Sequence, residues 1–198
     1  MGVSLSTEER ELLNNHDHDT ENAVKLFSTR EEVCRTNEVE FNRLTSRKFS
    51  YYTIDNFQWN PNHDHIQSKG FRYPDGTLRA LAEHRFDPQV HLKAGMFAVL
   101  LVNLNLQEGL VNGSQGVVRG FTPFREGDVD KIIMKARVGD GDPYAHFMEN
   151  DVREFMGQAP QKQWPVVQFD NDQIILIFCD CTINELEDEK PYSLISRT

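Results

Sequence analysis

Aromatic and basic side chains alternate in two neighbouring stretches of the sequence, over 47–59 and 71–73. Aromatic rings stack on nucleobases and cations attract phosphates, so this mixture is typical of surfaces that bind single-stranded nucleic acid. The alternative is that half of these rings fill the core of the protein. The residues concerned are Arg47, Lys48, Phe49, Tyr51, Tyr52, Phe57, Trp59, Phe71, Arg72 and Tyr73.

Histidines and cysteines form patterns that could hold a metal. Two His-Asp-His clusters, at 16–18 and 63–65, would let both imidazoles of each cluster share a divalent cation. Both clusters lie in polar, loop-like sequence, where solvated histidines are commoner. Cys179 and Cys181 would share one face of a strand, but a zinc site needs four ligands and the sequence has no second cysteine pair. We therefore expect packed thiols and no bound metal.

The sequence contains no Gly-x-x-x-x-Gly-Lys-Ser/Thr loop and no Gly-Lys pair. Nucleotide motors need that loop, because its backbone N–H groups hold the phosphates and its lysine neutralises their charge. An apolar run that ends at Asp180 is similar to the strand that holds Mg²⁺ in such motors. Without the loop there is no nucleotide for the metal to bridge, so a buried strand is the better interpretation. We expect no catalytic residues and no bound cofactor in this chain alone.

The charge is distributed unevenly along the 198 residues, whose formal net charge is −10. The net charge is −5 for residues 1–22, +2 for 23–103 and −7 for 104–198. A strongly acidic total argues against a nucleic-acid binder, but binding along a phosphate chain depends on local cations. We interpret the acidic flanks as mainly solvated surface.

The composition is that of a globular protein, with 38% hydrophobic and 26% charged residues. Three cysteines do not make a disulfide framework, which indicates a reducing compartment. No apolar run approaches the ~20 residues that span a bilayer. We therefore expect a soluble protein without a membrane contact.

The first 44 residues predict a leader followed by a strand and a helix. Residues 1–22 form an acidic leader that we expect to be partly disordered, and 23–29 form a short apolar strand. Thr29 with Glu32 three residues later has the spacing of a capping box, and an amphipathic pattern then runs to Leu44. Strand, capped turn and helix form the unit of an α/β sheet domain, and the N-terminus of such a helix suits a phosphate.

Residues 92–198 predict a β-rich region. A nearly unbroken apolar run over 92–105 is typical of a buried strand, and Asn112-Gly113 is a strong turn signal. A helix is indicated over 145–158. Further strands are predicted at 165–169, 173–183 and 192–197. Several short strands separated by turns suggest a small barrel.

Three stretches in this order resemble the Pif-type (petite integration frequency) family of superfamily 1 DNA helicases. They are AVKLFSTREEVCRTNEVEFNRL, LKAGMFAVLLVNLNLQEGLVNGSQGVVRGF, and WPVVQFDN followed by PYSLISRT. The middle stretch is the most specific. In that family a strand ending in Asn, a linker and Leu-Val-Asn-Gly-x-x-Gly-Val-Val open a small barrel of the Src-homology type, which interrupts the second RecA-like domain.

The resemblance implies an α/β fold with a partial second RecA-like motor domain over 23–91. It implies a small barrel region over 92–198, with an acidic insert at 122–163 and a last strand that returns to the motor domain. The activity implied is that of an ATP-dependent 5′-to-3′ DNA helicase of genome maintenance, in the nucleus or mitochondrion. Single-stranded DNA would be the partner, and ATP with Mg²⁺ would serve the complete enzyme.

Residue roles follow from the same resemblance. Arg30 would contact a nucleotide phosphate, and Thr29 and Asn37 would contact DNA phosphates. The other DNA-binding candidates are Asn112, Gly113, Gln115, Arg47, Lys48 and Tyr51.

The family's first motor domain and the motifs that complete its ATP site have no counterpart in this sequence. We therefore expect a helicase fragment that is inactive alone. The alternative is a non-catalytic adaptor that binds a protein partner through the acidic insert at 122–163, which the −7 charge of 104–198 favours. A relic without an independent role is the third interpretation.

Overall fold

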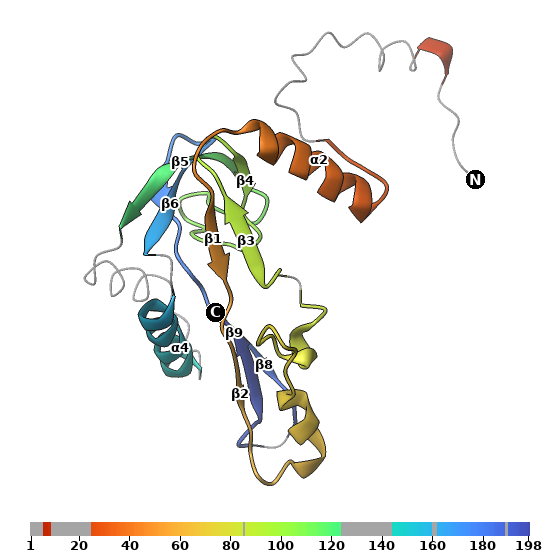
Figure 1. Cartoon of the computed structure of the whole chain (residues 1–198), viewed down its shortest axis with the longest axis vertical. Helices are drawn as coiled ribbons and strands as arrows, with labels where there is room; N and C mark the ends of the chain where they lie inside the picture. The colour runs from red at the N-terminus through yellow and green to blue at the C-terminus, as the bar shows by residue number, and fades with distance from the viewer. Residues whose placement is uncertain (1–5, 9–24, 85, 124–143, 160–161, 189) are drawn as a thin grey trace. The chain divides into compact units, whose positions relative to one another are not determined.

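The computed structural model describes residues 6–8, 25–84, 86–123, 144–159, 162–188 and 190–198 (Figure 1). The chain divides into two compact units, Met1–Asn42 and Arg43–Thr198, and each is described by itself. No helix in the described ranges is both long enough and apolar enough to cross a membrane.

The first unit contains helix α2, Arg30–Arg43, which begins where the capping signal predicts. Thr29 Oγ1 accepts a hydrogen bond from the Glu32 backbone N–H at 3.3 Å and donates one to the Glu32 carboxylate at 3.0 Å. None of the residues of α2 is buried. The strand predicted at 23–29 is wrong for its described part, because residues 25–29 are not in a strand. A short apolar segment needs a neighbouring strand to pair with, and the described part of this unit offers none.

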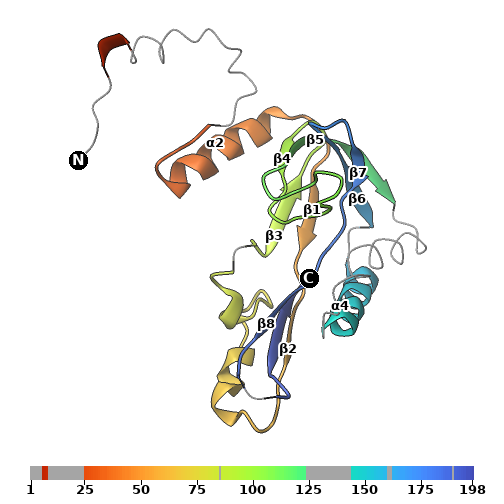
Figure 2. The ribbon, with the colours of Figure 1, turned by 180° about the vertical axis from the view of Figure 1, so that it is seen from behind.

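The second unit is built around a four-stranded antiparallel sheet (Figures 1 and 2). Its strands, in spatial order, are β4 (Phe97–Val99), β5 (Gln115–Pro123), β6 (Gln163–Phe169) and β7 (Ile174–Leu176). Side chains alternate between the two faces of a strand. The inner face buries Val118, Val167 and Phe169 against Leu110 from the loop before β5.

Two smaller antiparallel sheets complete this unit. A two-stranded ribbon pairs β1 (Phe49–Tyr52) with β3 (Gln89–Leu92). A three-stranded sheet has the order β2 (Asp55–Gln58), β9 (Leu194–Arg197) and β8 (Thr182–Glu185). Two 3₁₀ helices, η2 (Asp64–Gly70) and η3 (Arg79–Leu81), lie between β2 and β3 in the sequence. The last strand, β9, thus returns to pair with a strand from the early part of the chain.

Helix α4, Ala145–Gln158, confirms the helix predicted over 145–158. It buries Val152 and Phe155, and Phe155 shares a core cluster with Ala159 and Trp164. The expected acidic insert at 122–163 therefore contains a helix that belongs to the core. Residues 124–143 of that insert lie outside the described residues.

Buried polar side chains connect the three-stranded sheet to the rest of the unit. Arg197 of β9 donates two hydrogen bonds to the Asp55 carboxylate, at 2.8 and 2.9 Å, and a third to the Phe86 carbonyl at 2.8 Å. Asp151 of α4 accepts hydrogen bonds from the Ser196 hydroxyl and from the Asn56 amide. Both carboxylates are nearly inaccessible to solvent, so each needs these partners to offset its lost hydration.

The predicted strands are correct in place more often than in length. The single buried strand expected at 92–105 is wrong, because a turn separates β3 from β4 and residues 100–105 lie outside the named strands. The strand expected at 173–183 is interrupted between β7 and β8. The ladders of the described residues form three sheets, and the small barrel stays a prediction. Apolar content alone does not show where backbone hydrogen bonding stops.

Candidate nucleic-acid interface

The four-stranded sheet has an outer face that exposes apolar and basic side chains. Phe97 and Val99 of β4 lie directly opposite Val117 and Gln115 of β5, so these four share one face. Phe97 is 60% exposed and Val99 is 51% exposed. An accessible ring on a sheet can stack a nucleobase whatever the base, because every base presents a π face.

Arg119 belongs to the same face. Its Nε donates a hydrogen bond at 2.8 Å to Oε1 of Gln168, and Gln168 lies opposite Val117 in the ladder. The ladder is irregular between Val118 and Gly120, so Arg119 is the extra residue of a bulge. The bulge leaves its guanidinium exposed beside the apolar surface of β4 and β5.

Cations lie on three segments that meet near the start of β4, and we call this group the basic corner. The basic corner consists of Arg47, Lys48, Lys93 and Arg119. Ser46 Oγ donates a hydrogen bond to the Ala94 carbonyl at 2.8 Å, and Lys93 Nζ donates one to the Leu44 carbonyl at 2.8 Å. These bonds hold the segment before β1 against the turn that leads into β4.

The same turn reaches the bulge of β5. The Gly95 backbone N–H donates a hydrogen bond to the Val118 carbonyl at 2.8 Å, which places the turn next to Arg119. Arg47 lies over the ring of Phe49, with its guanidinium carbon 5.1 Å from the ring centroid. Local cations of this kind attract a phosphate chain even where the whole protein is acidic.

The Asn112-Gly113 turn lies at the other end of β4. Gly113 has a φ of +93°, and its N–H donates a hydrogen bond to the Leu100 carbonyl at 2.8 Å. The turn that the sequence predicts is thus confirmed, and the left-handed φ accounts for the glycine. Gln115 accepts a backbone hydrogen bond from Asp170 at 3.0 Å. Exposed acidic residues lie near this end of β4 and β5; they are Glu108, Asp170 and Asp172.

Tyr51 of β1 packs against Trp164 of β6. Its hydroxyl donates a hydrogen bond to the Gln163 carbonyl at 2.7 Å, and its ring lies 5.4 Å from that of Trp164. Burial raises the pKa of the Tyr51 hydroxyl. The structure therefore does not bring Tyr51 together with Arg47 and Lys48, although the three are close in sequence.

Thr29, Arg30 and Asn37 belong to the first unit and are all exposed. Thr29 caps α2, Arg30 is its first residue and Asn37 lies in its middle. The Glu32 carboxylate accepts hydrogen bonds from the hydroxyls of Ser28 and Thr29. The predicted phosphate contacts of this helix remain predictions.

The other aromatic residues of 49–73 divide between core and surface. Phe49 is buried and stacks on Phe121, with centroids 3.8 Å apart. Trp59 donates its indole N–H to the His63 carbonyl at 3.1 Å. Tyr52 and Phe71 are more than half exposed.

Sequence reasoning missed Phe97, Lys93 and Arg119 as candidates. The available signal was the spacing of two from Phe97 to Val99, and again from Gln115 to Val117 and from Val117 to Arg119. The surrounding run is so uniformly apolar that it resembles a strand buried on both faces.

No group of three or more metal-ligating side chains lies within the described residues. His63 is buried and hydrogen-bonded to Ser193 at 3.0 Å, while His65 faces Glu187 at 2.8 Å. The cluster at 16–18 lies outside the described residues. Burial, and next the negative charge of Asp180, raise the pKa of the Cys179 thiol.

Comparisons with known proteins bear on the same part of the chain. Residues 79–121 match the family model of the 2B domain of DNA helicase Pif1. This range includes η3, β3, β4 and the first part of β5, and hence Phe97, Lys93 and Arg119. No curated protein sequence matches the chain significantly.

A solved structure supports the likeness at the level of fold. The crystal structure of Pif1 helicase from Candida albicans matches 86% of this chain with a TM-score of 0.52 and 22% sequence identity. The match covers 32% of that helicase, so the chain spans about a third of its length. The resemblance to Pif-type DNA helicases is therefore confirmed: this chain is similar to part of Pif1 helicase in fold and, over 79–121, to its 2B domain in sequence.

Proposed function

We propose that this chain is the DNA-side part of an ATP-dependent 5′-to-3′ DNA helicase that acts in genome maintenance, and that it does not hydrolyse ATP alone. The observation that carries the proposal is the outer face of β4 and β5. It combines the exposed ring of Phe97 with the basic corner, within and beside the segment that matches a helicase domain. ATP and Mg²⁺ would act with the rest of such an enzyme, in the nucleus or mitochondrion.

The proposed contacts involve the basic corner and the outer face of β4 and β5. Arg47 and Lys48 of the basic corner bind backbone phosphates, because they are exposed cations. Phe97 stacks a base, and Gln115 offers an amide to a base edge or sugar. Asn112 and Gly113 lie beside the bound DNA, at the end of β4 where exposed carboxylates repel phosphates.

We further propose that the ribbon β1–β3 and the four-stranded sheet correspond to the small barrel of the family, and that α2 corresponds to a helix of its second RecA-like domain. In that arrangement Thr29 and Asn37 contact the DNA backbone and Arg30 contacts a nucleotide phosphate. Tyr51 acts only indirectly, because its hydroxyl is bound to Gln163.

The decisive experiment measures binding of the full chain to a fluorescein-labelled oligothymidylate by anisotropy at several salt concentrations. The double variant Arg47→Ala/Arg119→Ala removes two cations of the basic corner. We expect weaker binding and a salt slope smaller by about 1.4, at roughly 0.7 for each single-strand phosphate contact. Arg153→Ala is the matched control, because Arg153 is an exposed arginine of α4 paired with Glu149.

Three results would contradict the proposal. The first is the absence of binding at low salt, and the second is an equal loss of binding in the Arg153→Ala control. The third is ATP turnover by the purified chain above background, since the sequence contains no phosphate-binding loop.

The adaptor alternative rests on the acidic C-terminal part of the chain, with its net charge of −7 over 104–198. Removing all of 122–163 would also remove Phe155 and its core contacts, so loss of a partner could reflect unfolding. A deletion restricted to 124–143 avoids this problem. A partner captured by the intact chain and lost from this deletion would favour the adaptor, and unchanged capture would count against it.

A further inference from the structure

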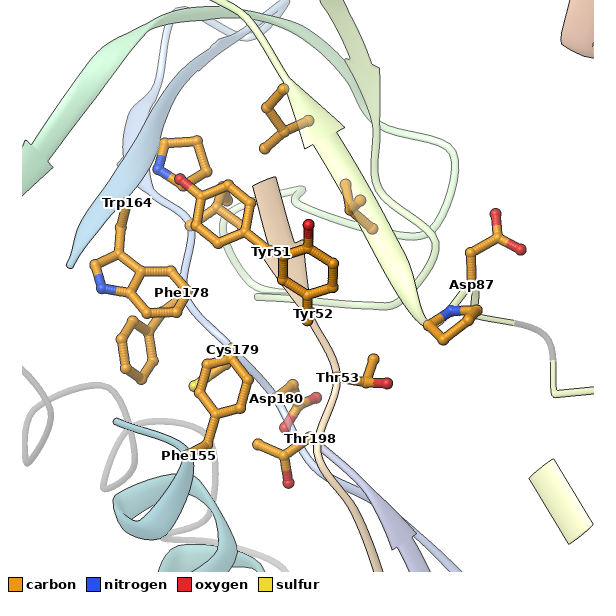
Figure 3. A pocket seen from close by; sticks show the side chains of 15 residues that line it. Tyr51, Tyr52, Thr53, Asp87, Phe155, Trp164, Phe178, Cys179, Asp180 and Thr198 are labelled. Carbon is orange, nitrogen blue, oxygen red and sulfur yellow. The ribbon is translucent and has the colours of Figure 1, made fainter. Parts of the chain in front are cut away.

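A groove with a volume of about 240 Å³ opens between the ribbon β1–β3 and the segment that follows β7 (Figure 3). Helix α4 and the start of β6 also contribute to its walls. None of the outer-face residues Phe97, Gln115 and Arg119 lines it. The groove is therefore a separate feature from the candidate nucleic-acid interface.

Aromatic rings form most of one wall. The ring of Trp164 lies 4.7 Å from that of Phe178, 5.4 Å from that of Tyr51 and 6.0 Å from that of Phe155, measured between centroids. Tyr52 also lines the groove and is 51% exposed. Such a wall binds apolar groups through buried area and attracts cations through the negative faces of its rings.

The charged residues of the groove are all acidic. Asp87 and Asp180 line it and are exposed, whereas none of the described lining residues is lysine, arginine or histidine. The two carboxylates come from different parts of the wall: Asp87 precedes β3, and Asp180 precedes β8.

We propose that this groove binds a short apolar segment of a partner protein that carries an arginine or lysine. The rings receive the apolar side chains and the stem of the basic residue, and the two carboxylates attract its charged end. Nucleic acid is a poor occupant, because its phosphates would face Asp87 and Asp180. The inference goes beyond the DNA-handling role and does not depend on it.

The test uses the full chain and the capped peptide acetyl-Leu-Arg-Leu-amide, followed by NMR of the two tryptophan indole N–H groups. Trp164 lines the groove and its Nε1 has no hydrogen-bond partner, so its resonance should move on titration. Trp59 does not line the groove and serves as the internal control. The matched peptide contains citrulline, which keeps the shape of arginine but not its charge.

We expect the citrulline peptide to bind about fivefold more weakly than the arginine peptide, as for loss of one partly exposed ion pair. Asp87→Asn and Asp180→Asn should each weaken the arginine peptide by a similar factor and leave the citrulline peptide unchanged. Asp170→Asn, an exposed carboxylate outside the groove, should change neither affinity.

Several outcomes would overturn the proposal. They are equal affinity for the two peptides, no movement of the Trp164 resonance up to millimolar peptide, or an equal loss in Asp170→Asn. An oligothymidylate that shifts the Trp164 resonance at lower concentration than the arginine peptide would also refute it, and would assign the groove to nucleic acid.

Discussion

In strands β4 and β9, the burial of the side chains is the opposite of what their residue types suggest. Phe97 and Val99 of β4 are more than half exposed, whereas Ser196 and Arg197 of β9 are 0% and 3% exposed. β9 lies between β2 and β8, while within the described residues β4 is an edge strand that pairs with β5 alone. The exposed fraction of a side chain therefore depends more on the position of its strand within the sheet than on its residue type. A polar side chain in a central strand is stable there because it has hydrogen-bond partners, and an edge strand can leave apolar side chains exposed.

The largest expected effect comes from breaking the buried ion pair between Arg197 of β9 and Asp55 of β2. Arg197→Ala leaves the buried Asp55 carboxylate without its cation and, within the described residues, with only the Leu78 N–H as a hydrogen-bond donor, which should lower the free energy of unfolding by about 3–5 kcal/mol. Urea denaturation followed by circular dichroism measures it. The double variant Asp55→Ala/Arg197→Ala should cost less than the sum of the two single variants. Strict additivity would show that the pair is not coupled.

Next in size is a change inside the four-stranded sheet. A Cβ added at Gly116 would lie 2.5 Å from the Gln168 carbonyl oxygen, so the backbone must move. Gly116→Ala should therefore cost about 1–3 kcal/mol of unfolding free energy. In the same strand, a Cβ at Gly120 meets nothing within 4 Å, and Gly120→Ala should change stability by less than about 0.5 kcal/mol. Equal losses in a thermal melt would refute the packing argument.

Substitution of the exposed Phe97 of β4 should lower the affinity for DNA without lowering the stability of the fold. Phe97→Ala should change the unfolding free energy by less than about 0.5 kcal/mol, because the ring is mostly exposed. It should weaken binding to oligothymidylate by about 1–3 kcal/mol if Phe97 stacks a base. Phe169→Ala, in the buried inner face, should instead cost about 3–5 kcal/mol of stability. A large loss of stability in Phe97→Ala would remove the contrast between the two faces.

The smallest expected effect concerns α2, which has no buried residue to support it. Thr29→Ala removes the side-chain acceptor at the start of the helix, worth about 1 kcal/mol. Thr29→Ser, which keeps the hydroxyl, is the matched control. NMR chemical shifts of residues 30–33 should report fraying in the first variant alone. Equal fraying in both variants would show that the hydroxyl is not what starts the helix.

Local signals predicted the elements that depend on local chemistry. The capping pair Thr29 and Glu32 located the start of α2, and Asn112-Gly113 located a turn, because each acts through bonds within a few residues. The prediction of one strand over 92–105 is wrong, since these residues are divided among two strands, the turn between them and a loop. Tyr51 was grouped with Arg47 and Lys48, although its hydroxyl is bound 112 positions away, at Gln163.

By itself, the sequence determined the absence of a phosphate-binding loop, the positions of caps and turns, and a resemblance that the 2B-domain match supports. Only the tertiary structure decided that Arg47, Lys48, Lys93 and Arg119 gather at one corner and that Asp87 and Asp180 line one groove. The physical reason is that caps and turns use hydrogen bonds between near neighbours in the chain. Surfaces and grooves depend on strand pairing between distant segments, which no short window of sequence specifies.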